Sequence, residues 1–133
     1  MPATSTASVV VLDDRGVTLD DVVAVARHDA RVEFTERSLE GMAVTRARID
    51  ELAGAAEPKY GISTGFGALA TRHISPDLRT QLQRSLIRSH AAGMGDPVER
   101  EVVRALMFLR LKTLASGRTG IRPEPSSTTT SPR

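Results

Sequence analysis

Apolar residues recur along this chain of 133 residues with two different periods, and each period predicts a type of element. A β-branched run at residues 9–12 predicts a short strand, which the turn-forming residues 13–16 would end. Elsewhere apolar positions repeat every three or four residues, as on one face of a helix. We therefore expect a mainly α-helical fold with one minor strand. The predicted helices cover about residues 19–30, 36–52, 76–92 and 97–115.

Helix-end signals support these boundaries. Thr18 followed by Asp21 is a capping-box-like start for the first helix, and Gly54 is a natural stop for the second. Ser75 can cap the third helix, because Pro76 behind it fits the first helical position. The apolar face of the fourth helix is too extensive to stand alone in water. That predicted face comprises Val102, Ala105, Leu106, Leu109 and Leu114.

Two segments lack any helical period. Between residues 57 and 74, three glycines fall around Tyr60 and Phe66, which predicts a mobile or specially shaped loop. Residues 123–133 are mostly proline, serine and threonine, so we expect a disordered tail there. We therefore divide the chain into a folded segment, residues 1–122, and this tail.

Composition narrows the classes of function. The chain has no cysteine, which excludes disulfides and thiolate chemistry. No apolar run approaches the roughly 20 residues of a membrane helix, and no signal peptide is found, so we expect a soluble, cytoplasmic protein without membrane contact. The formal charge is only +2 and the charges are interleaved, so nucleic acid is not an expected partner. We expect no metal site, and we place His28 and His73 at the surface.

Two motifs carry most of the functional signal. The first is Tyr-Gly-Ile-Ser-Thr-Gly-Phe-Gly at residues 60–67, and the second is Ser-His-Ala-Ala-Gly at residues 89–93. The first resembles the Tyr-Gly-x-x-Thr-Gly-Phe-Gly loop of the aromatic amino-acid ammonia-lyases, and the second resembles a stretch of their histidine-specific branch. The resemblance extends from residue 9 to residue 122. The chain is therefore similar to the N-terminal portion of a histidine ammonia-lyase.

This resemblance implies a reaction and a set of site residues. The family removes a proton from the β-carbon of L-histidine and expels ammonia, which gives urocanate. By the resemblance, Tyr60 is the catalytic base on a loop that closes over the substrate, and His90 binds the substrate imidazole. The family enzyme is a homotetramer, and its electrophile is a methylidene-imidazolone group made from an internal Ala-Ser-Gly. The implied loop-shaping residues are Gly61, Thr64, Gly65 and Gly67.

We expect the precursor of that electrophile to lie outside this chain. In the family it lies downstream, in a Gly-Ala-Ser-Gly-Asp-Leu-Ala-Pro-like context. Ala115-Ser116-Gly117 has the right residues but matches a different stretch, at the end of the fourth helix, so we interpret it as a decoy. We expect a chain that is truncated and inactive on its own. A frameshift, premature stop or fragmentary gene is our hypothesis for the tail.

Alternatives stay open at this point. A non-catalytic helical module that associates with an intact lyase or with itself fits the same residues. A hydrolase would use residues 61–65 as a nucleophile elbow, with Ser63, Asp77 and His90 in catalytic order, but only one strand is predicted, well upstream. In purely structural roles, Tyr60 would anchor a turn, and His90 would pack on the apolar face of a helix with its ring satisfied by a backbone carbonyl. Tyrosine stays open beside histidine as the original substrate.

Overall fold

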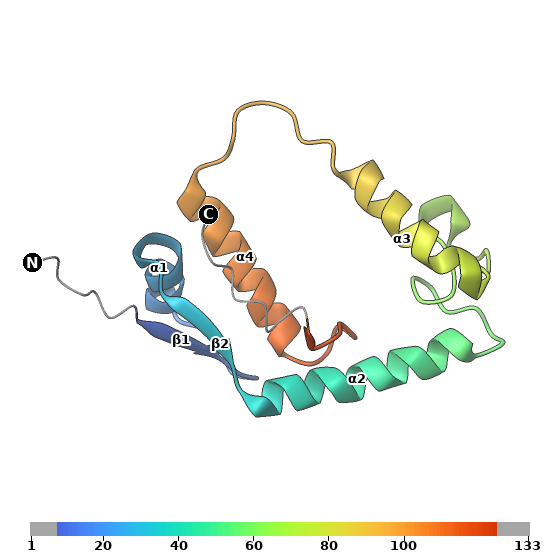
Figure 1. Cartoon of the computed structure of the whole chain (residues 1–133), viewed down its shortest axis with the longest axis horizontal. Coiled ribbons are helices and arrows are strands. Elements are labelled where there is room, and N and C mark those ends of the chain that lie inside the picture. The colour runs from blue at the N-terminus through green and yellow to red at the C-terminus, as the bar shows by residue number, and fades with distance from the viewer. Residues whose placement is uncertain (1–7, 125–133) are drawn as a thin grey trace, which may run out of the picture. The chain divides into compact units, whose positions relative to one another are not determined.

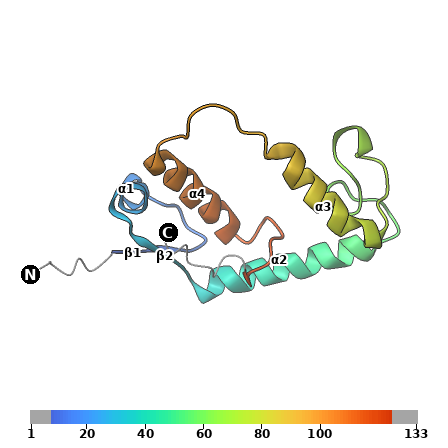
Figure 2. The same cartoon turned by 45° about the horizontal axis from the view of Figure 1, so that its top comes forward.

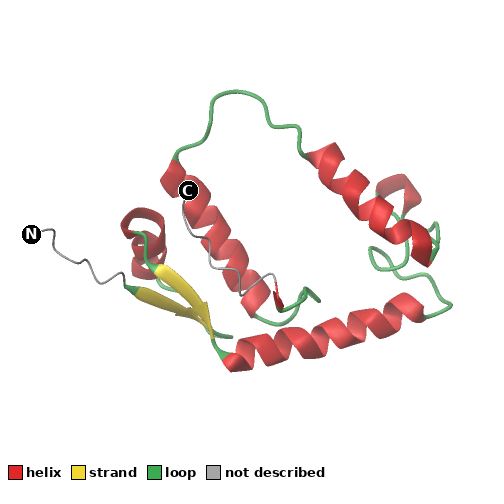
Figure 3. Cartoon of the chain, in the orientation of Figure 1, coloured by secondary structure: helices red, strands yellow, loops and turns green. Residues whose placement is uncertain are grey.

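The described chain is mainly helical, as the sequence predicts. The structure is a computed structural model and describes residues 8–124 (Figure 1). Within this range four α-helices accompany a two-stranded sheet and one short 3₁₀ helix (Figure 3), and none of these helices is long and apolar enough to cross a membrane. The predicted tail lies, from residue 125 onward, outside the described residues. The elements are β1 Val9–Leu12, α1 Leu19–His28, β2 Arg31–Phe34, α2 Glu36–Gly54, η1 Gly67–Leu69, α3 Pro76–His90 and α4 Arg100–Ala115.

The chain forms two units, each with its own internal packing. The first joins the residues before 48 to those after 97, and it holds the sheet, α1, α4 and most of α2. The second comprises Arg48–Pro97 and holds the end of α2, the glycine-rich loop and α3. Both sequence motifs, at residues 60–67 and 89–93, therefore lie in the second unit.

β1 and β2 form a parallel pair in which Val10 stands opposite Val32. Parallel neighbours need a crossover connection, and α1 supplies it in this small β-α-β unit. Figure 2 shows the sheet nearly edge-on, with α1 and α4 on the same side of it. The predicted strand is therefore present as β1, whereas its partner β2 was not predicted. The sequence of β2, Arg-Val-Glu-Phe, alternates polar and apolar residues over only four positions, which is too short a run to identify by period.

α1 is bounded by local hydrogen bonds that its sequence encodes. The Asp21 N–H donates to Thr18 Oγ1 at 3.1 Å, and the Thr18 N–H donates to an Asp21 carboxylate oxygen at 2.8 Å. This reciprocal capping box confirms the predicted helix start. The bond from the Thr18 backbone, helped by the Thr18 hydroxyl, holds the pKa of Asp21 below its ordinary value. The helix ends at His28, after which Asp29 adopts a left-handed conformation with φ of +56°.

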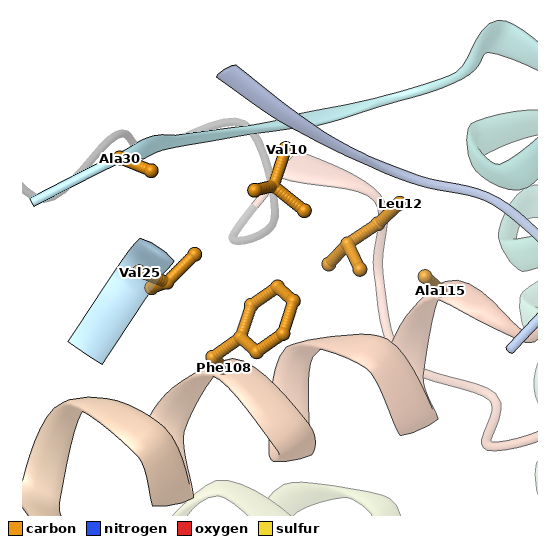
Figure 4. Close-up of a cluster of buried hydrophobic side chains, with 6 residues drawn as sticks. All are labelled: Val10, Leu12, Val25, Ala30, Phe108 and Ala115. Atoms are coloured by element: carbon orange, nitrogen blue, oxygen red, sulfur yellow. The ribbon is translucent and has the colours of Figure 1, made fainter. Parts of the chain in front are cut away.

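The core of the first unit gathers side chains from the sheet, α1 and α4. Phe108 is 1% exposed, and its ring points from α4 toward Val10 and Leu12 of β1 (Figure 4). Val25 of α1 and Ala115 of α4 belong to the same buried cluster. Full burial of a phenylalanine or leucine side chain stabilises a fold by about 1.5–3 kcal/mol. This cluster therefore ties the β-α-β unit to a helix from a distant part of the sequence.

α4 buries a different face from the one predicted. Its buried side is formed by Phe108 and Ala115 with the partly buried Leu111, whereas Leu106 and Leu109 are 69% and 46% exposed. Apolar residues of α4 lie on all sides of the helix, so its own sequence does not determine which face packs. The choice depends on β1 and α1, which contact the side that carries Phe108. The predicted excess of exposed apolar surface is nevertheless present.

Ion pairs join the end of α1 to the start of α4. Arg27 contacts the two carboxylate oxygens of Glu101 at 2.7 and 3.4 Å. Asp29 accepts a hydrogen bond from Arg100 at 2.7 Å and lies 3.3 Å from Arg104 Nε. The bond from Arg100 holds the pKa of Asp29 below its ordinary value. Because most of these groups are well exposed, the pairs add little to the free energy of unfolding, and their main effect is on how α1 and α4 are oriented.

In the second unit, one arginine joins three segments. Arg79 of α3 donates through Nη1 to the Ala53 carbonyl oxygen of α2 at 2.8 Å. Its Nε donates to the Ile74 carbonyl oxygen, at the end of the loop, at 3.1 Å. Pro76 stands in the first turn of α3, as predicted. The start of α3 is therefore fastened both to the end of α2 and to the loop.

Three helix boundaries differ from those predicted. α2 continues through Gly54, α3 ends at His90 instead of near Gly93, and α4 begins at Arg100 instead of at Pro97. Glycine and proline mark the neighbourhood of a helix end without fixing the last hydrogen-bonded residue. His90 consequently lies at the C-terminal end of α3.

Candidate active site

The glycine-rich loop leads from α2 into α3, and its backbone requires glycine at particular positions. Gly61 and Gly67 have φ of +71° and +56°, in the left-handed region that other residues rarely adopt. Gly65 has no room for a side chain, because a Cβ there would lie 2.5 Å from the Cβ of Leu69. The local conformation of the loop therefore depends on these three glycines.

Hydrogen bonds close the loop on itself. The Gly61 N–H donates to Thr64 Oγ1 at 3.1 Å, and that hydroxyl donates to the Gly65 carbonyl oxygen at 3.1 Å. The Ser63 carbonyl oxygen accepts the Ile74 N–H at 2.9 Å, which attaches the loop to the segment before α3. The loop is therefore a specially shaped turn with its own hydrogen-bond network.

Tyr60 projects from this turn toward solvent. Tyr60 is 66% exposed, and its ring meets the ring of Phe66 edge-on, with centroids 6.1 Å apart and planes at 78°. Edge-to-face ring pairs of this kind contribute about 0.5–1.5 kcal/mol. Phe66 therefore orients the tyrosine ring on one side and leaves most of the side chain accessible to a ligand.

A charge pair adjoins Tyr60 in the sequence. Lys59 Nζ lies 2.5 Å from a carboxylate oxygen of Glu57. The hydrogen bond from Lys59 holds the pKa of Glu57 below its ordinary value. The ammonium group next to the candidate base is thus already paired with a carboxylate.

His90 is the last residue of α3 and its side chain turns back along the helix. Its Nδ1 lies 2.9 Å from the Leu86 carbonyl oxygen and 3.0 Å from Ser89 Oγ. When Nδ1 carries the proton and donates to Leu86, the other ring nitrogen, Nε2, is a hydrogen-bond acceptor. The residue is exposed. The structural alternative for His90 is met in part, because its ring contacts a backbone carbonyl oxygen as that alternative requires, but the residue is exposed and not packed on an apolar face.

The structure does not join Tyr60 directly to His90. The loop is attached at Ile74, beside the start of α3, whereas His90 ends this helix of 15 residues. Fourteen steps of helical rise separate the two ends by about 21 Å. Within residues 8–124 neither a hydrogen bond nor a ring contact links the two side chains. The candidate base and the candidate substrate contact thus occupy separate places in the second unit.

The Ala-Ser-Gly at residues 115–117 does not fit the precursor of a methylidene-imidazolone group. Ala115 is the last residue of α4 and is buried in the core of the first unit. Ser116 is an ordinary C-cap, with its hydroxyl donating to the Thr113 carbonyl oxygen at 2.7 Å. Gly117 packs against the backbone of Gly41. The tripeptide is a helix end with a packing function, and no catalytic step is assigned to it.

The nucleophile-elbow alternative does not hold. An elbow joins a strand directly to a helix, but residues 58–63 contain no strand, and the described sheet is the pair β1 and β2. Ser63 is 0% exposed, and its Oγ accepts the Lys59 N–H at 2.9 Å. Its hydroxyl is therefore turned into the loop and away from any substrate. His28 and His73 are exposed, as predicted.

The fold and this loop agree with comparisons to known proteins. The family model for aromatic amino acid lyases matches residues 17–129. The chain belongs to the aromatic amino acid lyase family. The family inferred from two sequence motifs is thereby confirmed.

Histidine ammonia-lyases are among the most similar relatives. The chain is 64% identical to that of Streptomyces griseus over 119 residues, which cover 90% of this chain and 23% of the relative. It is 43% identical to that of Streptococcus gordonii over 114 residues, 86% of this chain and 22% of the relative. The chain therefore spans less than a quarter of the length of these relatives.

Solved structures show the same fold. Ergothionase from Treponema denticola matches with a TM-score of 0.85 and 28% identity, over 90% of this chain and 24% of that one. Histidine ammonia-lyase from Trypanosoma cruzi matches with a TM-score of 0.78 and 34% identity, over 89% of this chain and 22% of that one. The helical segment described above is thus shared by an ergothioneine-degrading enzyme and a histidine ammonia-lyase.

Proposed function

We propose that this chain contributes the base loop and a substrate contact to a histidine ammonia-lyase, which converts L-histidine into urocanate and ammonia. The observation that carries the proposal is the exposed Tyr60, held on a turn whose backbone is hydrogen-bonded beneath it. The 64% identity to the Streptomyces griseus enzyme supports L-histidine as the substrate. No feature of residues 8–124 favours the non-catalytic module instead.

Tyr60 is the base in this proposal. In its deprotonated form it takes a proton from the β-carbon of L-histidine, and the electrons of the broken C–H bond form the double bond of urocanate as the amine leaves as ammonia. A base must come within about 2.6–3.2 Å of its target. An exposed side chain on a defined turn meets that need when the substrate docks against the loop. In the family, the methylidene-imidazolone group supplies the electrophile that activates the substrate.

His90 recognises the substrate ring. With Nδ1 donating to the Leu86 carbonyl oxygen, Nε2 accepts the N–H of the substrate imidazole. A phenyl ring would leave that acceptor unpaired, which disfavours phenylalanine. The loop is attached at one end of α3 and His90 lies at the other, so we propose that the two side chains reach one substrate only in the assembled longer protein. We propose a cytoplasmic homotetramer for that assembly.

A chimera tests this function. In it, the matching 119 residues of this chain replace those of the Streptomyces griseus relative. We expect urocanate from L-histidine, followed by its ultraviolet absorbance, and rates lower by about 10²-fold or more with L-tyrosine and L-phenylalanine. A folded chimera that forms no urocanate, while the parent enzyme is active, would contradict the proposal.

The role of His90 is tested by substitution in the same chimera. We expect His90→Phe to lower kcat/KM for L-histidine by about 10–10²-fold and to raise relative activity on L-phenylalanine, because an apolar ring then faces the substrate. His28→Gln, at an exposed histidine of the first unit, is the matched control and should leave both values unchanged. Equal effects of the two substitutions would contradict the assignment of His90 to the substrate site.

A further inference from the structure

Two buried hydroxyl groups hold the backbone on both sides of Tyr60. The Lys59 N–H donates to Ser63 Oγ at 2.9 Å, and the Gly61 N–H donates to Thr64 Oγ1 at 3.1 Å. Ser63 also donates its own N–H to the Lys59 carbonyl oxygen at 3.0 Å. Ser63 therefore engages both backbone groups of the residue before Tyr60. We name Ser63 and Thr64 the hydroxyl clasp.

Burial separates the clasp from the side chain that it presents. Ser63 and Thr64 are 0% and 3% exposed, whereas Tyr60 is 66% exposed. The N–H groups of Lys59 and Gly61 are only part-buried, but the hydroxyls that accept from them are buried, so loss of either hydroxyl removes a fixed acceptor from the turn. The clasp is therefore a fixed support under an accessible ring.

The clasp is itself anchored to the segment that precedes α3. The Ser63 carbonyl oxygen accepts the Ile74 N–H at 2.9 Å, and the Gly65 N–H donates to the Arg72 carbonyl oxygen at 3.3 Å. Between these two bonds, Thr64 pairs with His73 as an isolated antiparallel bridge. These hydrogen bonds thereby fix the backbone on either side of Tyr60 relative to the start of α3.

We propose that Ser63 is a positioning residue for the base Tyr60. The inference rests on the proposed function, in which Tyr60 removes a proton from the substrate. Misplacement of a reacting group by about 1 Å can lower a rate by about 10²-fold. Ser63 stands at one of the variable positions of the Tyr-Gly-x-x-Thr-Gly-Phe-Gly motif, so its role comes from the contacts with Lys59 and not from the motif.

Kinetics of the chimera described above provide the first part of the test. We expect Ser63→Ala to lower kcat by about 10–10²-fold while KM for L-histidine changes by less than about threefold, because the base is displaced and the binding groups are not. Ser75→Ala is the matched control, since the side chain of this exposed serine caps nothing. A rise in KM without a fall in kcat would overturn the proposal.

A double substitution separates positioning from general damage. In a Tyr60→Phe background, Ser63→Ala should lower kcat further by less than about twofold, because there is no base left to position. An equal loss in both backgrounds would show that Ser63 acts only on the fold and would overturn the proposal. If Tyr60→Phe alone has no effect, the proposed function fails, and the inference about Ser63 fails with it. If only Ser63→Ala has no effect, the inference alone fails.

Amide hydrogen exchange tests the clasp without any activity. In the chain of 133 residues, the amides of Lys59 and Gly61 should both exchange slowly. Ser63→Ala should speed exchange at Lys59 by about 10-fold or more and leave Gly61 slow, because Thr64 still holds that amide. Unchanged exchange at Lys59 would show that Ser63 does not hold it, and the proposal would be overturned.

Discussion

Gly117 packs directly against the backbone of Gly41, where the segment after α4 meets α2. A Cβ at position 117 would lie 2.8 Å from the carbonyl carbon of Gly41, and Gly117 has φ of +67°. The Thr45 hydroxyl donates to the Gly117 carbonyl oxygen, and Arg46 donates to that of Gly120 at 3.3 Å. These contacts explain the glycine of the Ala-Ser-Gly sequence by packing.

Gly117→Ala should therefore destabilise the first unit. We expect the free energy of unfolding to fall by about 1–3 kcal/mol, because alanine is strained at this φ and its methyl group meets the backbone of α2. Urea unfolding followed by circular dichroism measures the change. Gly54→Ala is the control, since a Cβ there meets nothing within 4 Å, and it should leave stability equal or slightly higher. Equal effects at the two positions would contradict the packing described here.

The assignment of the buried face of α4 can be tested by truncating one side chain on each side of the helix. Phe108→Ala should lower the free energy of unfolding by about 3–5 kcal/mol, because it empties the centre of the cluster around β1. Leu106→Ala removes a side chain that is 69% exposed and should change stability by less than about 0.5 kcal/mol. If Leu106→Ala lowered the free energy of unfolding as much as Phe108→Ala, the face predicted from the sequence would be the buried one.

The ion pairs between α1 and α4 should make the free energy of unfolding depend on pH in the acidic range. The hydrogen bond from Arg100 lowers the pKa of Asp29 in the folded chain below its ordinary value of 3.8. The unfolded chain therefore takes up the proton first as pH falls, so the contribution of Asp29 is complete above its ordinary pKa and is lost as pH falls through the lowered value.

Asp29→Asn removes this contribution while keeping a residue that tolerates the left-handed conformation. The variant should be less stable than the parent chain near pH 6, and the difference should shrink as pH falls below 3.8, the ordinary pKa of Asp29. Urea unfolding at several pH values measures it. Asp96→Asn, at an exposed aspartate before α4, is the control. A difference that persists unchanged into acid would mean that Asp29 acts through the backbone and not through its charge.

Much of the fold follows from local sequence. The β-branched run of β1, the capping box of Thr18 and Asp21, and Pro76 at the start of α3 act through neighbouring residues, so their patterns could be interpreted correctly. β2 and the buried face of α4 could not, because both depend on distant partners. The four residues of β2 become a strand by pairing with β1, and Phe108 is buried because β1 and α1 cover it.

The sequence predicts the special backbone of the glycine-rich loop, whereas the roles of Tyr60 and His90 stay predictions. The motif indicates Tyr60, and the glycines of the loop follow from the same pattern. It does not indicate that Ser63 and Thr64 hold the peptides on either side of Tyr60, since that arrangement requires the turn to form first. It also does not indicate that α3 places His90 away from the point where the loop is attached.

In the proposed function, the phenol oxygen of Tyr60 is the catalytic base. Tyr60→Phe in the chimera tests it most directly, because phenylalanine keeps the ring and its edge contact with Phe66 while it removes the hydroxyl. The measurement is the steady-state rate of urocanate formation from L-histidine. We predict that kcat falls by about 10²–10⁴-fold with little change in KM. A variant that keeps kcat within about twofold of the parent chimera would contradict the assignment.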